Sequence, residues 1–102
     1  MVNKALVMGP NDNVATVIED LEQGTSVPLV IGGKTRSIKV KQKIPFGHKF
    51  AVSKISKGDK VIKYGEVIGI ATQPIEEGEH VHVQNVESVY SIELVQERRE
   101  RK

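Results

Sequence analysis

The sequence contains no cysteine and no tryptophan, and aromatic residues make up only 4% of its 102 residues. Without cysteine, the chain cannot form a disulfide, a thiolate metal site or a cysteine nucleophile, which is compatible with a reducing cytosol. Because aromatic side chains are so few, the core has to consist mainly of valine, isoleucine and leucine, which pack well on pleated surfaces. The composition therefore favours a mainly β protein.

Long hydrophobic runs are also lacking. The apolar run within Lys4 to Met8 is too short for a signal peptide, and no run approaches the roughly 20 residues that span a bilayer. The net charge of +2, from 15 basic and 13 acidic residues, gives no strong field towards nucleic acid or an anionic membrane. We expect a soluble, cytoplasmic protein that binds neither.

The length suits a single domain with one modest core. We place this domain at residues 1–95, with a last strand over Ser88 to Val95. Residues 96–102 are almost wholly charged and are expected to form a disordered tail.

One short helix is predicted near the N-terminus. Its apolar residues recur with the spacing of one helical face: Val14, Val17, Ile18 and Leu21. Asp12 or Asn13 could cap its start, and Gly24 stands where a C-terminal cap belongs.

The next segments predict a β-hairpin. Val27 to Ile31 and Ser37 to Ile44 have the character of strands, and Gly32-Gly33 between them suits a tight turn. Alternation puts three lysines on one face of the second strand: Lys39, Lys41 and Lys43. Such a stripe could bind an anion, but a solvated face that discourages edge pairing is the simpler interpretation. Nucleic-acid binding is disfavoured because aromatic stacking residues are few.

A weak repeat, apolar-x-x-Gly-x-x-Val, occurs at Leu21 to Val27, Ile55 to Val61 and Ile75 to Val81. The second and third copies are the better pair, and each of them reads as a strand end, a glycine-centred turn and a new strand. The pattern predicts a folded-over β module built from short strands.

All three histidines lie between Ile44 and Asn85. His80 and His82 flank Val81, so on a strand both imidazoles share one face and Val81 can enter the core. Such a pair suits a divalent metal, an oxyanion or acid–base chemistry, but it also fits exposed strand histidines. His48 follows Gly47 in a turn, where a histidine is usually just exposed.

Four motifs in one order resemble a known family: Ile44 to Lys49, Gly58 to Gly65, Ile68 to Thr72, and Gly78 to Asn85. Together they closely resemble the N-terminal domain of altronate and galactarate dehydratases, in the SAF group. The resemblance implies a mainly β, β-clip (SAF-type) fold, to which the short N-terminal helix would be added. It also implies a small, non-autonomous subunit or N-terminal domain of a hydro-lyase that removes water from a sugar acid to give a 2-keto-3-deoxy acid.

The resemblance further implies a site shared with a large dehydratase catalytic subunit. Its residues would be His48, His80 and His82 as catalytic residues, and Lys63, Tyr64 and Asn85 as substrate-binding residues. A divalent metal, Fe²⁺ or Mn²⁺, would be held mainly by the large partner. Gln84 replaces a histidine that is common in the family, which weakens the case for metal ligation at that position.

Two other functions stay open at this point. One is a non-catalytic SAF-type module that binds a sugar acid or a protein, and the other is the small subunit of a sulfolactate-type lyase. A homo-oligomer is compatible with each of them.

Overall fold

The computed structural model describes residues 4–88, and these form nine short strands. The strands are β1 (Ala5–Leu6), β2 (Val14–Val17), β3 (Ser26–Ile31), β4 (Lys34–Lys39), β5 (Lys49–Ala51), β6 (Lys60–Lys63), β7 (Glu66–Ala71), β8 (His80–Val81) and β9 (Val86–Ser88). The prediction of a mainly β chain is confirmed. Nothing within residues 4–88 has the helical length and hydropathy of a bilayer-spanning segment.

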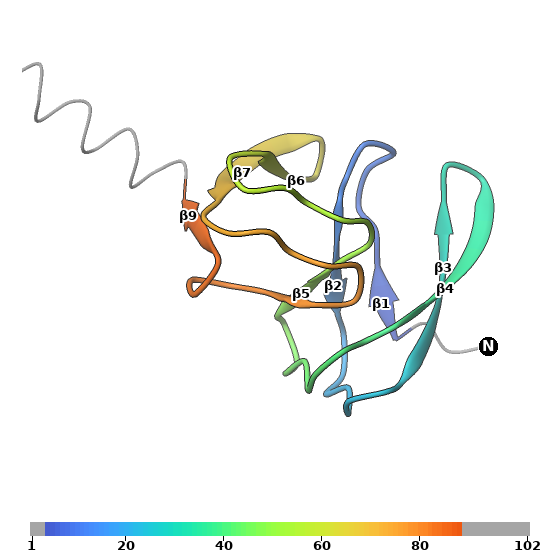
Figure 1. The fold of residues 1–102 in the computed structure, drawn as a ribbon. Coiled ribbons are helices and arrows are strands. Elements are labelled where there is room, and N and C mark those ends of the chain that lie inside the picture. Colours follow the sequence, from blue (N-terminus) through green and yellow to red (C-terminus); the bar gives the residue numbers. More distant parts are fainter. Residues whose placement is uncertain (1–3, 89–102) are drawn as a thin grey trace, which may run out of the picture.

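A four-stranded antiparallel sheet, ordered β1-β2-β5-β8, forms the middle of the molecule. The β3–β4 hairpin lies on one side of it, and the three-stranded sheet β6-β7-β9 lies on the other (Figure 1). Each side has its own hydrophobic cluster. Ala15 and Phe50 belong to the cluster that includes the hairpin, whereas Val14 and Ala51 belong to the one that includes β6 and β7.

The predicted helix beginning at Val14 is wrong, because this segment is the central strand β2. Val14, Ala15 and Val17 are all almost fully buried, since both faces of β2 are covered. A strand buried on both faces has no polar alternation, so its apolar spacing can imitate a helical face. Asp12 caps no helix. Its carboxylate accepts backbone hydrogen bonds from Gly9 and from the β6–β7 turn.

The predicted hairpin is confirmed, with shifted strand ends. Gly32 and Gly33 have φ angles of 59° and 80°, and Ile31 pairs with Lys34 across this two-residue turn. The second strand runs from Lys34 to Lys39 instead of from Ser37 to Ile44. The three lysines of the predicted stripe are exposed, as expected of a solvated face.

The glycine repeat has one more copy than the sequence pattern indicates. Four turns share the same geometry: Leu21–Val27, Ile44–Phe50, Ile55–Val61 and Ile75–Val81. In each, the glycine has a φ between 83° and 89°, and its N–H donates to a backbone carbonyl elsewhere at 2.8–3.0 Å. The second copy escapes the pattern because Phe50 occupies the valine position.

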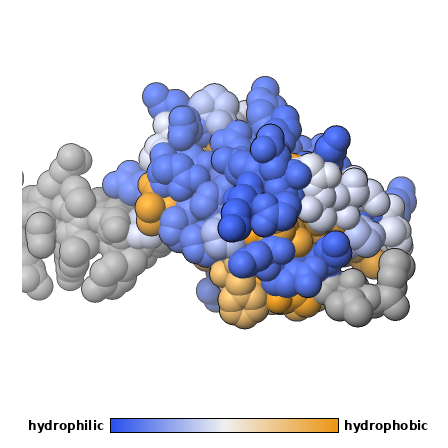
Figure 2. Space-filling view, turned by 90° about the horizontal axis from the view of Figure 1, so that it is seen from below, coloured by the Kyte–Doolittle hydropathy of each residue, from blue (hydrophilic) through white to orange (hydrophobic). Residues whose placement is uncertain are grey.

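These turns occur as two bridged pairs. Leu21 and Ile44 exchange both backbone hydrogen bonds, and so do Ile55 and Ile75. All four of these apolar residues are buried. The face of the molecule seen in Figure 2 is accordingly mostly hydrophilic, and hydrophobic residues appear on it as separate patches.

The expected strand over Ser88 to Val95 lies outside the described residues, apart from Ser88, which ends β9. The expected tail over residues 96–102 also lies outside them.

Alanine substitutions at Gly78 and Gly33 should distinguish a clash with a neighbouring backbone from strain within the turn itself. A Cβ on Gly78 would overlap the Lys39 carbonyl oxygen, whereas a Cβ on Gly33 meets no atom within 4 Å. Because both glycines have positive φ, an alanine at either position should lower the free energy of unfolding by about 1–2 kcal/mol through its left-handed backbone conformation. Gly78→Ala should lower the free energy of unfolding by about 3 kcal/mol or more, because the overlap adds to that penalty. Urea denaturation measures both, and equal losses would contradict the close contact.

Candidate functional site

The site begins with the pairing of β5 and β8. These strands are antiparallel, and Lys49 pairs with Val81 while Phe50 pairs with His80. Continuing this register by one residue places His48, from the turn before β5, opposite His82, directly after β8. The two rings stack with centroids 4.3 Å apart and planes 21° apart.

All three histidines of the chain meet at this point. The His80 ring stacks with those of His48 and His82 at centroid distances of 5.1 and 5.5 Å. His48 Nδ1 and His80 Nε2 are 2.9 Å apart, a hydrogen-bond distance. One nitrogen from each ring lies within 4.8 Å of the other two, and all three residues are half-buried. The expected common face of His80 and His82 is present, while Val81 is buried in the core.

Gln84 defines the protonation pattern of two of these rings. Its amide nitrogen lies 3.4 Å from the His80 carbonyl oxygen, which can only accept, so the amide orientation follows from this contact. The same nitrogen lies 3.2 Å from His80 Nδ1, which therefore accepts in a neutral ring. His80 then carries its proton on Nε2 and donates to His48 Nδ1.

Asn85 holds the backbone of the cluster. Its side chain is 1% exposed, donates to the His80 carbonyl at 2.8 Å and accepts from the His82 N–H at 3.0 Å. Gln42 accepts from the His80 N–H at 3.0 Å. Asn85 is therefore committed to the backbone that carries two of the histidines, and its expected contact with substrate stays a prediction.

Positive charge surrounds the imidazoles. Burial lowers the pKa of His80 below 6.5, and the charges of His48, His82 and Lys49 lower it further. Burial, followed by the charges of His48 and Lys49, also lowers the pKa of His82. Burial and the nearby charge of Lys63 lower the pKa of the Lys49 ammonium. His80 and His82 are therefore predominantly neutral near pH 7, beside the Lys49 ammonium group.

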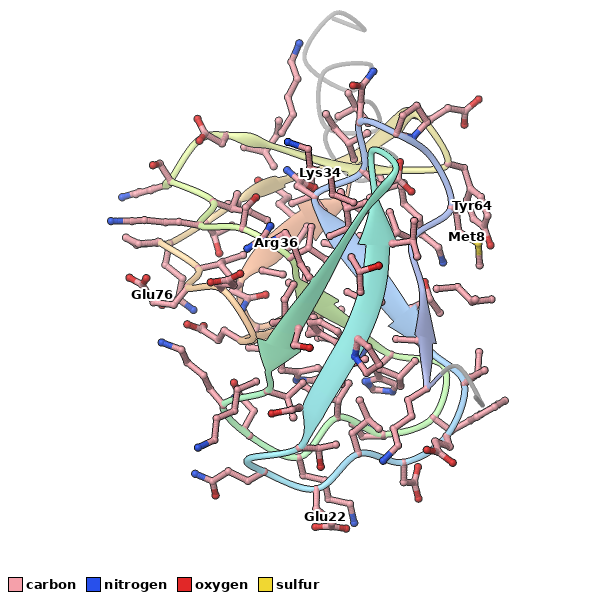
Figure 3. The ribbon with its side chains drawn as sticks, turned by 90° about the vertical axis from the view of Figure 1, so that its right-hand side faces the viewer. Met8, Glu22, Lys34, Arg36, Tyr64 and Glu76 are labelled. Carbon is pink, nitrogen blue, oxygen red and sulfur yellow. The ribbon has the colours of Figure 1, made fainter. Side chains whose placement is uncertain are left out.

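Lys63 and Tyr64 lie at the β6–β7 turn. The Lys63 ammonium is 4.9 Å from the centre of the Tyr64 ring, and the Tyr64 N–H donates to Asp12. Tyr64 is largely exposed and lies on the same side of the molecule as Met8 (Figure 3). Lys63 affects the histidine cluster only by lowering the pKa of Lys49. Tyr64 contacts Lys63 and Asp12 and not the histidines.

A shallow hollow of about 200 Å³ adjoins the cluster. Its lining combines His82 and Lys49 with apolar side chains that include Ile68, Val83 and Val86. Pockets that enclose a small molecule usually measure about 300–1,000 Å³. The hollow is therefore smaller than a pocket that encloses a small molecule.

Sequence reasoning missed two contributors, Lys49 and Gln42. Lys49 could have been suspected because it lies between His48 and a core phenylalanine on a strand. Gln42 belongs to a segment without regular structure, and no sequence signal places it against His80.

Known proteins are similar to this chain in sequence. The family described as the altronate/galactarate dehydratase SAF domain matches residues 3–89. An altronate dehydratase of Escherichia coli is 43% identical over 74 residues, which are 72% of this chain and 14% of that protein. The alpha subunit of a (2R)-sulfolactate sulfo-lyase of Chromohalobacter salexigens is 39% identical over 74 residues, which are 71% of this chain and 79% of that subunit. The chain thus spans about one seventh of the first relative and most of the second.

The charge of Lys49 should be measurable at the histidines. Lys49→Gln should raise the pKa of His80 and His82 towards 6.5 without reaching it, because burial remains the larger cause. Proton NMR titration of the ring signals measures this, and Lys34→Gln, at the tip of the β3–β4 hairpin, should leave both values unchanged. Unaltered midpoints in Lys49→Gln would contradict the electrostatic account.

The lowered pKa values of His80 and His82 also predict how stability depends on pH. Because the folded chain binds fewer protons than the unfolded chain just below pH 6.5, the free energy of unfolding should fall as the pH drops there.

Asn85→Ala should destabilise the chain. It removes an acceptor from the His82 N–H and a donor from the His80 carbonyl, both partly buried. We expect a loss of about 1–3 kcal/mol in the free energy of unfolding. Gln84→Ala, in the neighbouring exposed residue, should stay within about 0.5 kcal/mol of the parent in the same urea titration. A similar loss in both variants would mean that Asn85 does not hold this backbone.

Proposed function

Because the chain belongs to the altronate/galactarate dehydratase SAF domain family, we propose that it is the small, non-autonomous part of a sugar-acid dehydratase. In this proposal its histidines complete an active site whose remaining residues lie on a large catalytic polypeptide. The supporting observation is the meeting of His48, His80 and His82 beside a hollow too small to enclose a substrate.

Relatives carry this domain in two arrangements, within a long polypeptide and as most of a small subunit. Altronate dehydratase is several times longer than this chain, whereas a sulfo-lyase alpha subunit is nearly the same length. In the proposed complex the domain supplies one wall of the site, and the large catalytic polypeptide supplies the opposite wall. The large dehydratase subunit is therefore the partner that we propose.

The chemistry assigned to the complex is the loss of water from a sugar acid such as altronate or galactarate. A base on the partner takes the proton α to the carboxylate, and the β-hydroxyl then leaves as water, which gives a 2-keto-3-deoxy acid. A divalent ion, Fe²⁺ or Mn²⁺, would supply Lewis-acid stabilisation of the enediolate charge.

The residues of this chain suit two tasks in that reaction. Imidazoles exchange protons near neutral pH, so we assign the cluster to proton transfer at the leaving hydroxyl. Lys49 lines the hollow, and Lys63 lies close enough to lower the pKa of the Lys49 ammonium. Both positive charges are therefore placed to attract the substrate carboxylate. Tyr64 and Asn85 remain proposed substrate contacts.

A sulfolactate-type lyase is the second candidate, because this chain matches 79% of a sulfo-lyase alpha subunit. A sulfonate would meet the same ammonium groups and imidazoles as a carboxylate. A complex that cleaves (2R)-sulfolactate and leaves altronate and galactarate unchanged would decide for this candidate.

The test is co-expression with the large dehydratase subunit, followed by assays of altronate, galactarate and (2R)-sulfolactate with Fe²⁺, Mn²⁺ or Mg²⁺. His80→Ala and His82→Ala should each lower kcat by about 10²–10⁴-fold, because an acid–base group is lost. Lys34→Ala, on the distant hairpin, is the matched control and should retain full activity.

Two results would reject the proposal. Full activity in both histidine variants would show that these histidines take no part in the reaction. A chain that does not associate with the large subunit, but binds a sugar acid alone, would instead be a non-catalytic binding module.

A further inference from the structure

The histidine cluster has a property that acid–base catalysis does not require. One ring nitrogen from each of three residues lies within 4.8 Å of the other two, on a framework fixed by the β5–β8 pairing. Tetrahedral coordination at about 2.0–2.1 Å places ligand nitrogens roughly 3.4 Å apart. The three nitrogens are therefore within about an ångström or two of a shared coordination sphere.

We propose that His48, His80 and His82 together bind one divalent first-row transition-metal ion. This inference rests on the proposed function for its catalytic meaning, and in it Lewis-acid chemistry of the ion takes the place of proton transfer, because a ring nitrogen bound to a metal cannot exchange a proton. Ion binding itself needs neither partner nor substrate. It differs from the sequence-based expectation that the large partner holds most of the ligands. Gln84 is not needed as a ligand, because His48 supplies the third imidazole from across the sheet.

The donor set selects the class of ion. Three neutral imidazoles suit Fe²⁺, Co²⁺, Ni²⁺ or Zn²⁺, whereas Mg²⁺ and Ca²⁺ prefer oxygen ligands. No carboxylate is part of the cluster within residues 4–88. Three protein ligands leave at least one coordination position for a substrate oxygen, as in catalytic metal sites.

Ion binding requires a small rearrangement of side chains. The rings now stand within 14–21° of parallel, so they must turn about their Cβ–Cγ bonds to point at one ion. If His80 binds through Nε2, its proton moves to Nδ1, and the exposed Gln84 amide can turn its oxygen to accept it. Asn85 holds the backbone of His80 and His82 in place meanwhile.

Lys49 opposes a bare cation at this point, because it follows His48 directly in the chain and lines the same hollow as His82. A carboxylate that binds the ion and Lys49 together would cancel this repulsion. The arrangement therefore favours an ion that carries an anionic substrate. Lys49→Gln should consequently bind the free ion more tightly than the parent does.

The experiment uses the untagged full-length chain and Co²⁺, whose visible absorption and affinity report imidazole ligation without any assay of activity. We expect one Co²⁺ per chain, displaced by Zn²⁺ and not by excess Mg²⁺. His48→Phe, His80→Phe and His82→Phe each keep a flat ring in the stack and remove the nitrogen ligand. Each should weaken Co²⁺ binding by about tenfold or more, while circular dichroism verifies the fold.

Three results would overturn the inference: no Co²⁺ absorption in the parent chain, unchanged affinity in two or more of the phenylalanine variants, or weaker binding in Lys49→Gln. None of these outcomes depends on the dehydratase assignment. A chain that binds Co²⁺ through all three histidines but forms no active complex would retain the metal site and reject the proposed function.

Discussion

The structure depends on one hydrogen bond that is made four times. In each glycine turn, the N–H of a residue with positive φ donates to a carbonyl from another part of the chain. Only glycine adopts this conformation without a steric penalty, so the backbone reverses at the same point in every copy. Two of these turns, at Gly47 and Gly78, lead directly into β5 and β8. The pairing of those strands is what brings His48 into contact with His80 and His82, which lie more than thirty residues further along the sequence.

The histidine cluster combines a rigid backbone with adaptable side chains. Asn85 and the β5–β8 register fix the backbone, whereas the rings are half-buried and Gln84 is exposed. Ammonium groups at Lys49 and Lys63 make the surroundings positive, and the adjoining hollow is shallow. The same features suit an anionic substrate, together with either proton transfer by the imidazoles or a metal ion that they hold. A surface of this kind is what the proposed function requires of the smaller of two polypeptides that share a site.

Sequence reasoning correctly predicted the features that are set by residues close together in the sequence. Gly32-Gly33 identified the hairpin, and alternation placed His80 and His82 on one face with Val81 in the core. It failed where distant segments decide the outcome. Val14 to Val17 looked helical because both faces of β2 are covered by segments that the spacing cannot reveal. The position of His48 depends on a register between residues 50 and 80, which no local pattern encodes.

The four turns share a backbone but differ in the residues beside each glycine. Glutamate and glutamine precede Gly24, proline and phenylalanine precede Gly47, and serine and lysine precede Gly58. Because the glycine and its hydrogen bond set the shape of the turn, these flanking positions can change without moving the strands. Evolution, or a protein engineer, can therefore install new reactive groups in one turn while the other three preserve the scaffold.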